Sequence, residues 1–178
     1  TYTGSSMSHA IRCAKKEKGR FAKSDSIRFF GYDSFAGFGL LPDEDRHAFY
    51  TDHNFSTDYE KVCRRVNKVA GGCFSVNLIK GYFDESLIGG AKAHGINKAR
   101  IVFIDSDTKS SAEQALKYCC SVVQSGTFFI IDDFFSYRGN SQLGVAGALT
   151  AFCEKNQIKL RQVFTYGMGG SVFVVDKI

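Results

Sequence analysis

The chain of 178 residues contains no tryptophan and only one proline, Pro42. A single proline argues against long extended linkers between domains. None of the six cysteines forms a C-x-x-C pair, which excludes the common zinc-ligand spacings. Scattered cysteines of this kind are typical of small buried side chains in a reducing compartment, so we expect a cytoplasmic protein.

Long runs of one character are also absent. No apolar run approaches the roughly 20 residues of a membrane span, and no signal peptide opens the chain. The net charge is a modest +5, without a long Lys/Arg run. The sequence therefore predicts neither a membrane nor a nucleic acid as a partner. The partner that we expect is a small-molecule acceptor, and a second copy of the chain is a further candidate partner.

What is present is an alternation of apolar strands and amphipathic helices. Such alternation predicts an α/β fold with a doubly wound, mainly parallel sheet. A glycine-rich turn near the end predicts an antiparallel hairpin. The length suits one domain over residues 1–178. The expected helices are 7–17, 58–69, 84–94, 111–123 and 143–155, and the expected strands are 27–32, 75–79, 101–104, 128–131, 159–164 and 171–175.

The chain begins with a glycine turn and a helix, with no strand before them. In a doubly wound sheet, the first strand is central and leads into that turn. We therefore expect that the native protein continues upstream of Thr1 and that a first central strand is missing from this sequence.

Two pairs of aspartates follow two apolar strands. Asp105 and Asp107 form the first pair, Asp132 and Asp133 form the second, and one helix-length segment separates them. Both pairs would therefore reach the same edge of a parallel sheet. Four carboxylates this close repel one another unless a cation or a shared proton lies among them. A divalent ion held there could lower the pKa of a substrate hydroxyl.

One of these four aspartates is expected to be structural only. Asp107 could cap the helix that follows it, and Asp133 could bind loop backbone. Two histidines of the long polar loop over residues 34–57, His47 and His53, are alternative general bases. Solvated loop side chains are the alternative interpretation of both histidines.

A second group of residues has the pattern of a nucleotide-binding unit. Gly4 would let the backbone approach a ligand, and Ser5 and Ser6 open a helix with free N–H groups. Either serine could equally cap that helix. Asp33 ends the next strand and is placed to accept hydrogen bonds from ribose hydroxyls, although Asp33 and Ser34 could also form a plain turn.

Gly81, Tyr82 and Phe83 follow the next strand, where adenine commonly packs between an apolar ring and a polar edge. Either ring could instead belong to the core. Tyr137 and Arg138 lie just after the second acid pair and are placed to contact a substrate. Ordinary surface loop residues are the alternative for both.

Several motifs together resemble the macrocin O-methyltransferase family. The stretch from Gly31 to Phe38, with Leu41-Pro42-Asp43 soon after, is similar to its F-D-S-F-E-G-L-P signature. The other matches are Leu78–Phe83 to its G-x-F, Ile104–Asp107 to its L-D-x-D, Ile131–Phe134 to its I-D-D-Y, Gly144–Phe152 to the helix that follows, and Thr1–Ser6 to the tail of its cofactor loop. One departure is Lys109, which stands where the family usually has tyrosine.

The resemblance implies a class I, Rossmann-like methyltransferase that uses S-adenosylmethionine and Mg²⁺ to methylate a sugar or natural-product hydroxyl. It implies metal ligands at Asp105, Asp132 and Asp133, and a catalytic base at Asp105. His47, which comes from the polar loop and not from the resemblance, is the second candidate for the base. The cofactor would contact Gly4, Ser5, Ser6, Asp33, Ser34, Gly81, Tyr82, Phe83 and Asp105.

Three other functions remain open at this point. Asp105-Ser106-Asp107-Thr108 is similar to the D-x-D-x-T motif of haloacid dehalogenase-like phosphatases, although their nucleophile strand lies near the start of the fold. A metal-dependent glycosyltransferase could use a D-x-D motif, but this would not explain the second acid pair. The last alternative is a non-catalytic nucleotide-binding module.

Overall fold

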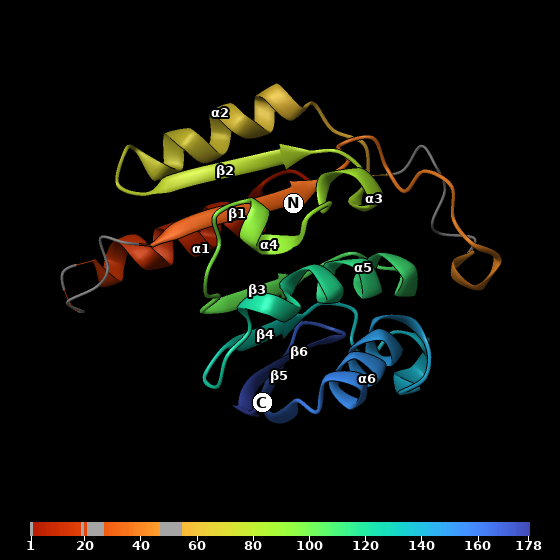
Figure 1. The fold of residues 1–178 in the computed structure, drawn as a ribbon. Coiled ribbons are helices and arrows are strands. Elements are labelled where there is room, and N and C mark those ends of the chain that lie inside the picture. Colours follow the sequence, from red (N-terminus) through yellow and green to blue (C-terminus); the bar gives the residue numbers. More distant parts are fainter. Residues whose placement is uncertain (1, 19, 21–26, 47–54) are drawn as a thin grey trace. The chain divides into compact units, whose positions relative to one another are not determined.

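The computed structural model describes residues 2–18, 20, 27–46 and 55–178. The chain divides into two compact units, which we describe separately (Figure 1). The N-terminal unit comprises residues 1–41 and 46–86, and the C-terminal unit comprises residues 42–45 and 87–178. In the part of the chain described, no helix combines the length and the apolar character that a membrane span requires.

In its described residues, the N-terminal unit contains two parallel strands and three helices. The strands β1 (Arg28–Asp33) and β2 (Ser75–Lys80) pair in register along their whole length. Their carboxyl ends therefore lie side by side, and the N–H of Gly81 donates to the carbonyl of Asp33 at 3.0 Å. The helices are α1 (Ser5–Glu17), α2 (Tyr59–Ala70) and the short α3 (Phe83–Ser86).

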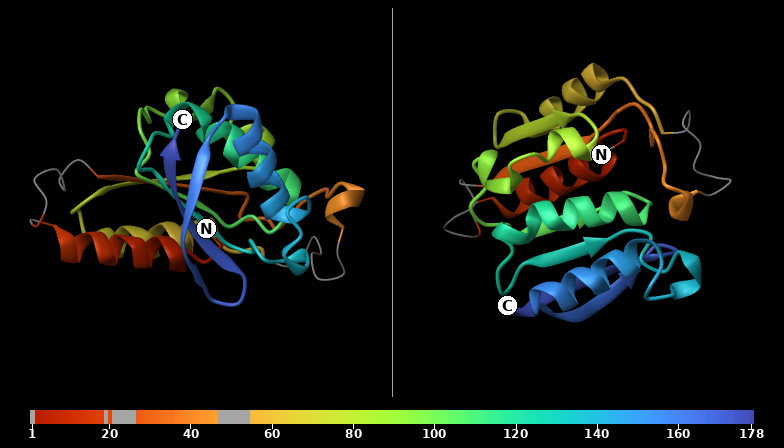
Figure 2. Two further views of the ribbon diagram at one scale, coloured as in Figure 1. Left: turned by 90° about the horizontal axis from the view of Figure 1, so that it is seen from below. Right: turned by 45° about the vertical axis from the view of Figure 1, so that its right-hand side comes forward.

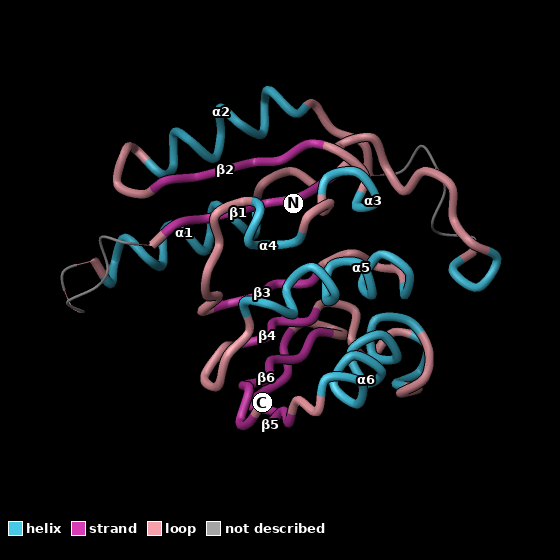
Figure 3. Tube along the Cα trace, in the orientation of Figure 1, coloured by secondary structure: helices cyan, strands magenta, loops and turns pink. Residues whose placement is uncertain are grey.

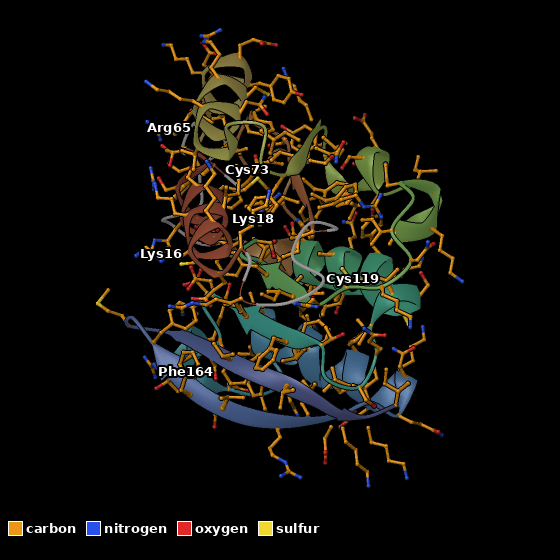
Figure 4. The ribbon with its side chains drawn as sticks, turned by 90° about the vertical axis from the view of Figure 1, so that its left-hand side faces the viewer. Lys16, Lys18, Arg65, Cys73, Cys119 and Phe164 are labelled. Carbon is orange, nitrogen blue, oxygen red and sulfur yellow. The ribbon has the colours of Figure 1, made fainter. Side chains whose placement is uncertain are left out.

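Helices α1 and α2 share the core of this unit. Ile11 of α1 and Val66 of α2 are completely buried, because the apolar residues of each helix recur on one face. Asp58 caps α2 by accepting a hydrogen bond from the N–H of Lys61 at 3.1 Å. Arg65, labelled on α2 in Figure 4, donates to the carbonyl of Thr3 at 2.9 Å and so ties the first turn of the chain to α2.

The C-terminal unit is built on a four-stranded sheet in the order β3-β4-β6-β5. Strands β3 (Ile101–Ile104) and β4 (Phe128–Ile131) are parallel. Strands β5 (Lys159–Tyr166) and β6 (Gly170–Lys177) form an antiparallel hairpin, and β6 pairs antiparallel with β4. Figure 3 shows the strands in magenta, and Figure 2 shows the long hairpin in blue from two further directions.

Two helices of the C-terminal unit, α5 (Lys109–Cys119) and α6 (Gly144–Asn156), cover one face of this sheet. Alternate strand residues such as Val102, Ile104, Phe129 and Ile131 point to that face and are buried. This packing fixes the carboxyl ends of β3 and β4, after which the aspartates follow. The remaining short elements of the unit are η2 (Asp43–Asp45), α4 (Gly90–Ala93), η3 (Cys120–Val122) and η4 (Tyr137–Gly139).

The predicted α/β fold with parallel strands and a terminal antiparallel hairpin is confirmed. The helix predicted over residues 84–94 is instead two short helices, because Gly89 and Gly90 adopt left-handed φ values of 83° and 72°. In the described residues, the strands pair as two sheets, β1-β2 and β3-β4-β6-β5. One domain over residues 1–178, with a first strand upstream, stays a prediction.

Candidate active site

The C-terminal unit gathers the two predicted pairs of aspartates into one group, which we call the acid cluster: Asp105, Asp107, Asp132 and Asp133. Parallel pairing places Ile104 beside Ile131, and the N–H of Asp132 donates to the carbonyl of Ile104 at 2.9 Å. One carboxylate oxygen from each of Asp105, Asp132 and Asp133 lies within 4.8 Å of the other two. The structure therefore brings together the three residues predicted to hold a metal ion.

The carboxylates of the acid cluster disturb one another electrostatically. Desolvation at the strand end, followed by the negative charge of Asp132, raises the pKa of Asp105 to about 6. Burial and the adjacent Asp133 raise the pKa of Asp107 to about 7. Both shifts have the sign expected of like charges held together without a cation. A divalent ion would relieve this repulsion.

The shift at Asp107 makes a prediction about stability and pH. Its pKa is about 7 in the folded protein against a usual 3.8, so the folded state binds more protons between those values. The free energy of unfolding therefore falls as pH rises from about 4 to about 7. Asp107→Asn removes this penalty, and asparagine tolerates the left-handed φ of 60° at this position.

We expect metal-free Asp107→Asn protein to melt about 2–4 °C above the wild type at pH 8, since solvent screening reduces the gain to about 1 kcal/mol. Near pH 4 the two melting temperatures should converge. Differential scanning calorimetry in the presence of a chelator measures both. A variant that melts below the wild type at pH 8 would show that Asp107 is stabilised as a carboxylate instead.

The hairpin contributes a residue to the acid cluster that the sequence did not indicate. The hydroxyl of Tyr166, at the end of β5, donates to Oδ1 of Asp132 at 3.2 Å. The Tyr166 ring lies directly over Gly170 at the start of β6, where any Cβ atom would overlap it. Burial and the charge of Asp132 raise the pKa of Tyr166, which keeps this hydroxyl protonated and able to donate.

The α5 helix, which follows the first acid pair, is capped by residues other than Asp107. Its N-cap is Thr108, whose hydroxyl accepts from the N–H of Ser111 at 3.4 Å. Asp45, which is 1% exposed, accepts from the N–H groups of Lys109 and Ser110 at 3.0 and 3.1 Å. The prediction that Asp107 caps this helix is therefore wrong. Asp107 has a left-handed backbone, whereas Thr108, which caps the helix with its side chain, is extended.

Asp133 is also held by local structure. Its backbone has a φ of 53°, and its Oδ1 accepts a hydrogen bond from the hydroxyl of Ser136 at 3.2 Å. The Ser136 hydroxyl is thus the hydrogen-bond donor to the Asp133 carboxylate in this loop, and the other carboxylates of the acid cluster surround it. Left-handed backbone at Asp107 and at Asp133 ends each acidic strand with the same sharp turn, which keeps the carboxylates near the strand ends.

The N-terminal unit brings the predicted cofactor residues near one another. The N–H of Tyr2 donates to Oδ2 of Asp33 at 2.8 Å, so the turn that contains Gly4, Ser5 and Ser6 starts beside the end of β1. Gly4 has a φ of 76° and is itself the N-cap of α1, which excludes Ser5 and Ser6 as the cap. A Cβ on Gly4 would lie 2.9 Å from Val62, so its closest approach is to α2.

The other predicted cofactor residues line the ends of β1 and β2. The N–H of Phe35 donates to Oδ1 of Asp33 at 2.7 Å, and the hydroxyl of Ser34 donates to the carbonyl of Gly37. This is the turn that the sequence offered as an alternative, and it orients the Asp33 carboxylate. Gly81 has a φ of 146°.

Two rings follow β2. Tyr82, which is 38% exposed, lies against Gly39, where a Cβ atom would come within 2.9 Å of its ring. Phe83 opens α3 and is half-buried. Neither ring is fully buried, unlike the core residues of this unit. Their roles toward a cofactor remain predictions. The candidate bases His47 and His53 lie outside the described residues.

Comparison with solved structures places the fold among O-methyltransferases. The structure of CalS11, a calicheamicin methyltransferase, matches with a TM-score of 0.72 at 14% identity over 93% of this chain and 67% of that one. Its apo structure, described as a TDP-rhamnose 3'-O-methyltransferase, matches with a TM-score of 0.62 at 12% identity over 93% and 66%. The O-methyltransferase NovP matches with a TM-score of 0.68 at 18% identity over 94% and 66%.

A Bacillus cereus O-methyltransferase in complex with SAH matches with a TM-score of 0.51 at 13% identity over 97% of this chain and 81% of that one. At these identities the likeness establishes the fold. The chain spans about two thirds of the length of CalS11 and NovP. No curated protein matches it.

The family comparison is more specific. The model of the macrocin-O-methyltransferase (TylF) family matches residues 21–164, which include Asp33 and all of the acid cluster. The stretch covers most of the chain, so the resemblance seen in its motifs is confirmed. The chain belongs to the macrocin-O-methyltransferase family, a family of methyltransferase enzymes.

Proposed function

We propose that this protein is an S-adenosylmethionine-dependent O-methyltransferase that methylates a hydroxyl of a sugar or a related small molecule with the help of Mg²⁺. The observation that carries the proposal is the group of three carboxylates, within 4.8 Å of one another, at the ends of two parallel strands in a chain of this family.

The acid cluster has the donor chemistry that Mg²⁺ requires. Its ligand atoms are carboxylate oxygens, which hard divalent cations prefer. Burial and the neighbouring carboxylates raise the pKa values of Asp105 and Asp107, and a bound cation would favour their ionised forms. Asp105, Asp132 and Asp133 would hold the ion. When bound, it would lower the pKa of an acceptor hydroxyl.

The N-terminal unit supplies the residues for S-adenosylmethionine. Asp33 is oriented by the N–H groups of Tyr2 and Phe35, as a residue that accepts hydrogen bonds from ribose hydroxyls needs to be. We propose that Gly4, Ser5, Ser6 and Ser34 contact the rest of the cofactor and that Gly81, Tyr82 and Phe83 contact its adenine. The cofactor would supply the electrophilic methyl group.

Asp105 is the residue we assign as the base. Its carboxylate lies in the acid cluster, where it would face a hydroxyl whose own pKa the ion lowers, so a carboxylate can take that proton. The acceptor oxygen would lose its proton to Asp105 and take the methyl group, while the S–CH3 bond of S-adenosylmethionine breaks and S-adenosylhomocysteine leaves. The Tyr166 hydroxyl holds the Asp132 carboxylate in place, and Asp132 in turn would help to orient the acceptor beside the acid cluster. His47 remains the second candidate for the base.

A sugar is the acceptor class that we propose. The matched family is that of macrocin O-methyltransferase, and CalS11, which shares this fold, is described as acting on TDP-rhamnose. Hydroxyls of sugars have pKa values far above neutrality, so their methylation benefits from a cation beside the reacting oxygen. The acid cluster, next to the acceptor, would bind such a cation.

Thermal melting with S-adenosylhomocysteine tests the proposal. We expect S-adenosylhomocysteine at 100 times its Kd to stabilise the folded protein by about 2.7 kcal/mol, with a further rise in melting temperature when Mg²⁺ is added. The same measurement with a nucleotide sugar alone tests the glycosyltransferase alternative. A shift with the nucleotide sugar, together with no shift with S-adenosylhomocysteine, would contradict the methyltransferase assignment.

A further inference from the structure

An open depression of about 740 Å³ lies in the C-terminal unit, along the loop between β4 and α6. Tyr137, Arg138, Asn140, Ser141 and Leu143 line it. Its volume lies within the range of small-molecule sites, and it combines an aromatic ring and a leucine with an amide, a hydroxyl and a guanidinium. This is the mixture of apolar and polar groups that a sugar derivative requires.

Tyr137 connects this depression to the acid cluster. Tyr137 follows Ser136, whose hydroxyl donates to Oδ1 of Asp133 at 3.2 Å, so the depression begins beside the acid cluster. Burial raises the pKa of Tyr137, and the negative charges of Asp45, Asp107 and Asp133 raise it further. Its ring packs over Gly144, where a Cβ atom would lie 2.5 Å from the ring carbon Cδ2. The ring is therefore held in place against Gly144, on the lining of the depression.

Arg138 is the only cationic side chain among the described residues that line the depression. Its backbone φ is 59° and follows a φ of 57° at Tyr137, so two consecutive residues with side chains adopt the left-handed conformation. Such strain costs on the order of 1 kcal/mol or more per residue and is characteristic of functional sites. Among the described residues, the Arg138 guanidinium has neither a hydrogen bond nor an ion pair.

We infer that this depression binds the methyl acceptor and that Arg138 binds an oxyanion of that acceptor, either a phosphate or a carboxylate. The inference rests on the proposed function and makes it more specific, because it requires an acidic sugar derivative. A guanidinium offers paired N–H donors that match both oxyanions. It also offsets the negative charges of the acid cluster, which would otherwise repel an anionic acceptor.

The other lining residues fit the neutral part of such an acceptor. The Tyr137 ring and Leu143, which is 47% exposed, present apolar surface for a sugar ring. Asn140 and Ser141 present polar groups for its hydroxyls. With the acceptor ring on Tyr137, its anionic group would lie on Arg138, and its reacting hydroxyl would face the acid cluster.

The test compares Arg138→Gln with the wild type on four acceptors that share one sugar: the nucleoside diphosphate sugar, the sugar 1-phosphate, the uronic acid and the neutral methyl glycoside. Methyl transfer gives kcat/KM for each acceptor, and calorimetry gives its Kd. Arg161→Gln is the matched control, because Arg161 is an exposed arginine on β5 that pairs with Asp176 at 3.2 Å.

We expect Arg138→Gln to lower kcat/KM for the acidic acceptors by about 10- to 100-fold, mainly through KM, with the neutral glycoside changed less than about 2-fold. The phosphate and uronic acid arms identify which oxyanion is bound. Equal losses on acidic and neutral acceptors, or none on either, would overturn the inference. If no acceptor is methylated, the proposed function fails, and a Kd for acidic sugars that depends on Arg138 still decides the binding site.

Discussion

Asp105→Asn is expected to lower kcat/KM for methyl transfer by about 10²- to 10⁴-fold, the range for loss of a general base. The amide cannot take the acceptor proton, and it removes one of the three carboxylates grouped within 4.8 Å. Asp105 follows β3 and lies outside the hydrophobic core, so the substitution leaves the core intact. Steady-state kinetics with a saturating concentration of Mg²⁺ measure the effect.

Cofactor binding by Asp105→Asn and the activity of a control variant show whether the loss is specific to the base. Binding of S-adenosylhomocysteine should stay within about 10-fold of the wild type, because the other proposed cofactor residues lie in the N-terminal unit. Asp176→Asn, a matched change at an exposed position of β6, should leave kcat/KM unaltered. Methyl transfer at the wild-type rate by Asp105→Asn would reject Asp105 as the base and make His47 the first candidate.

Tyr166→Phe is expected to weaken Mg²⁺ binding by about 10- to 100-fold, the usual effect of losing a residue that orients a metal ligand. The phenol oxygen is the only atom removed, and with it the 3.2 Å hydrogen bond to Asp132. Without that donor, the Asp132 carboxylate rotates more freely and must be ordered when the ion binds. Isothermal titration calorimetry with Mg²⁺ measures the affinity without requiring the acceptor.

Tyr118→Phe is the matched control for this change. Tyr118 is a buried tyrosine of α5 whose hydroxyl makes a 2.8 Å hydrogen bond with Nδ1 of His94, away from the acid cluster. This variant should lose some stability but keep its Mg²⁺ affinity. If the two variants bind Mg²⁺ equally, Tyr166 does not position Asp132.

The sequence was most informative where local pattern decides structure. Apolar runs followed by aspartates predicted both parallel strands and the meeting of Asp105, Asp132 and Asp133, since the ends of neighbouring parallel strands must coincide. The glycine-rich turn at 167–170 predicted the hairpin. These features depend on residues close in the chain, or on a rule of topology that needs no side-chain detail.

Contacts between distant residues were not predictable in this way. Asp45 reaches the N–H groups of Lys109 and Ser110 from 64 and 65 residues away. Tyr166 reaches Asp132 across 34 residues. No motif in the sequence around Asp45 or Tyr166 marks either residue, and their hydrogen-bond partners become visible only in the folded chain. The one feature of the local sequence that could have indicated Tyr166 is the glycine-rich turn after it, because Gly170 leaves space for the tyrosine ring.

The error at Asp107 has a local cause. An acidic residue just before a helix is a good N-cap, and so is the threonine that follows it. The strand ends in a sharp turn that places Asp107 in the left-handed region, with a φ of 60°. Thr108 is then the first extended residue and becomes the cap. Asp107 is thereby left beside Asp133, which raises its pKa.

Metal-dependent methylation of a sugar is tested by the transfer of a labelled methyl group from S-adenosylmethionine to a panel of sugar acceptors, with and without a chelator. We expect label to enter an O-methyl group of the acceptor, EDTA to abolish the transfer, and excess Mg²⁺ to restore it. Transfer that proceeds equally in EDTA would contradict the role of the acid cluster. Absence of transfer to every sugar, by protein that binds S-adenosylhomocysteine, would contradict the proposed acceptor class.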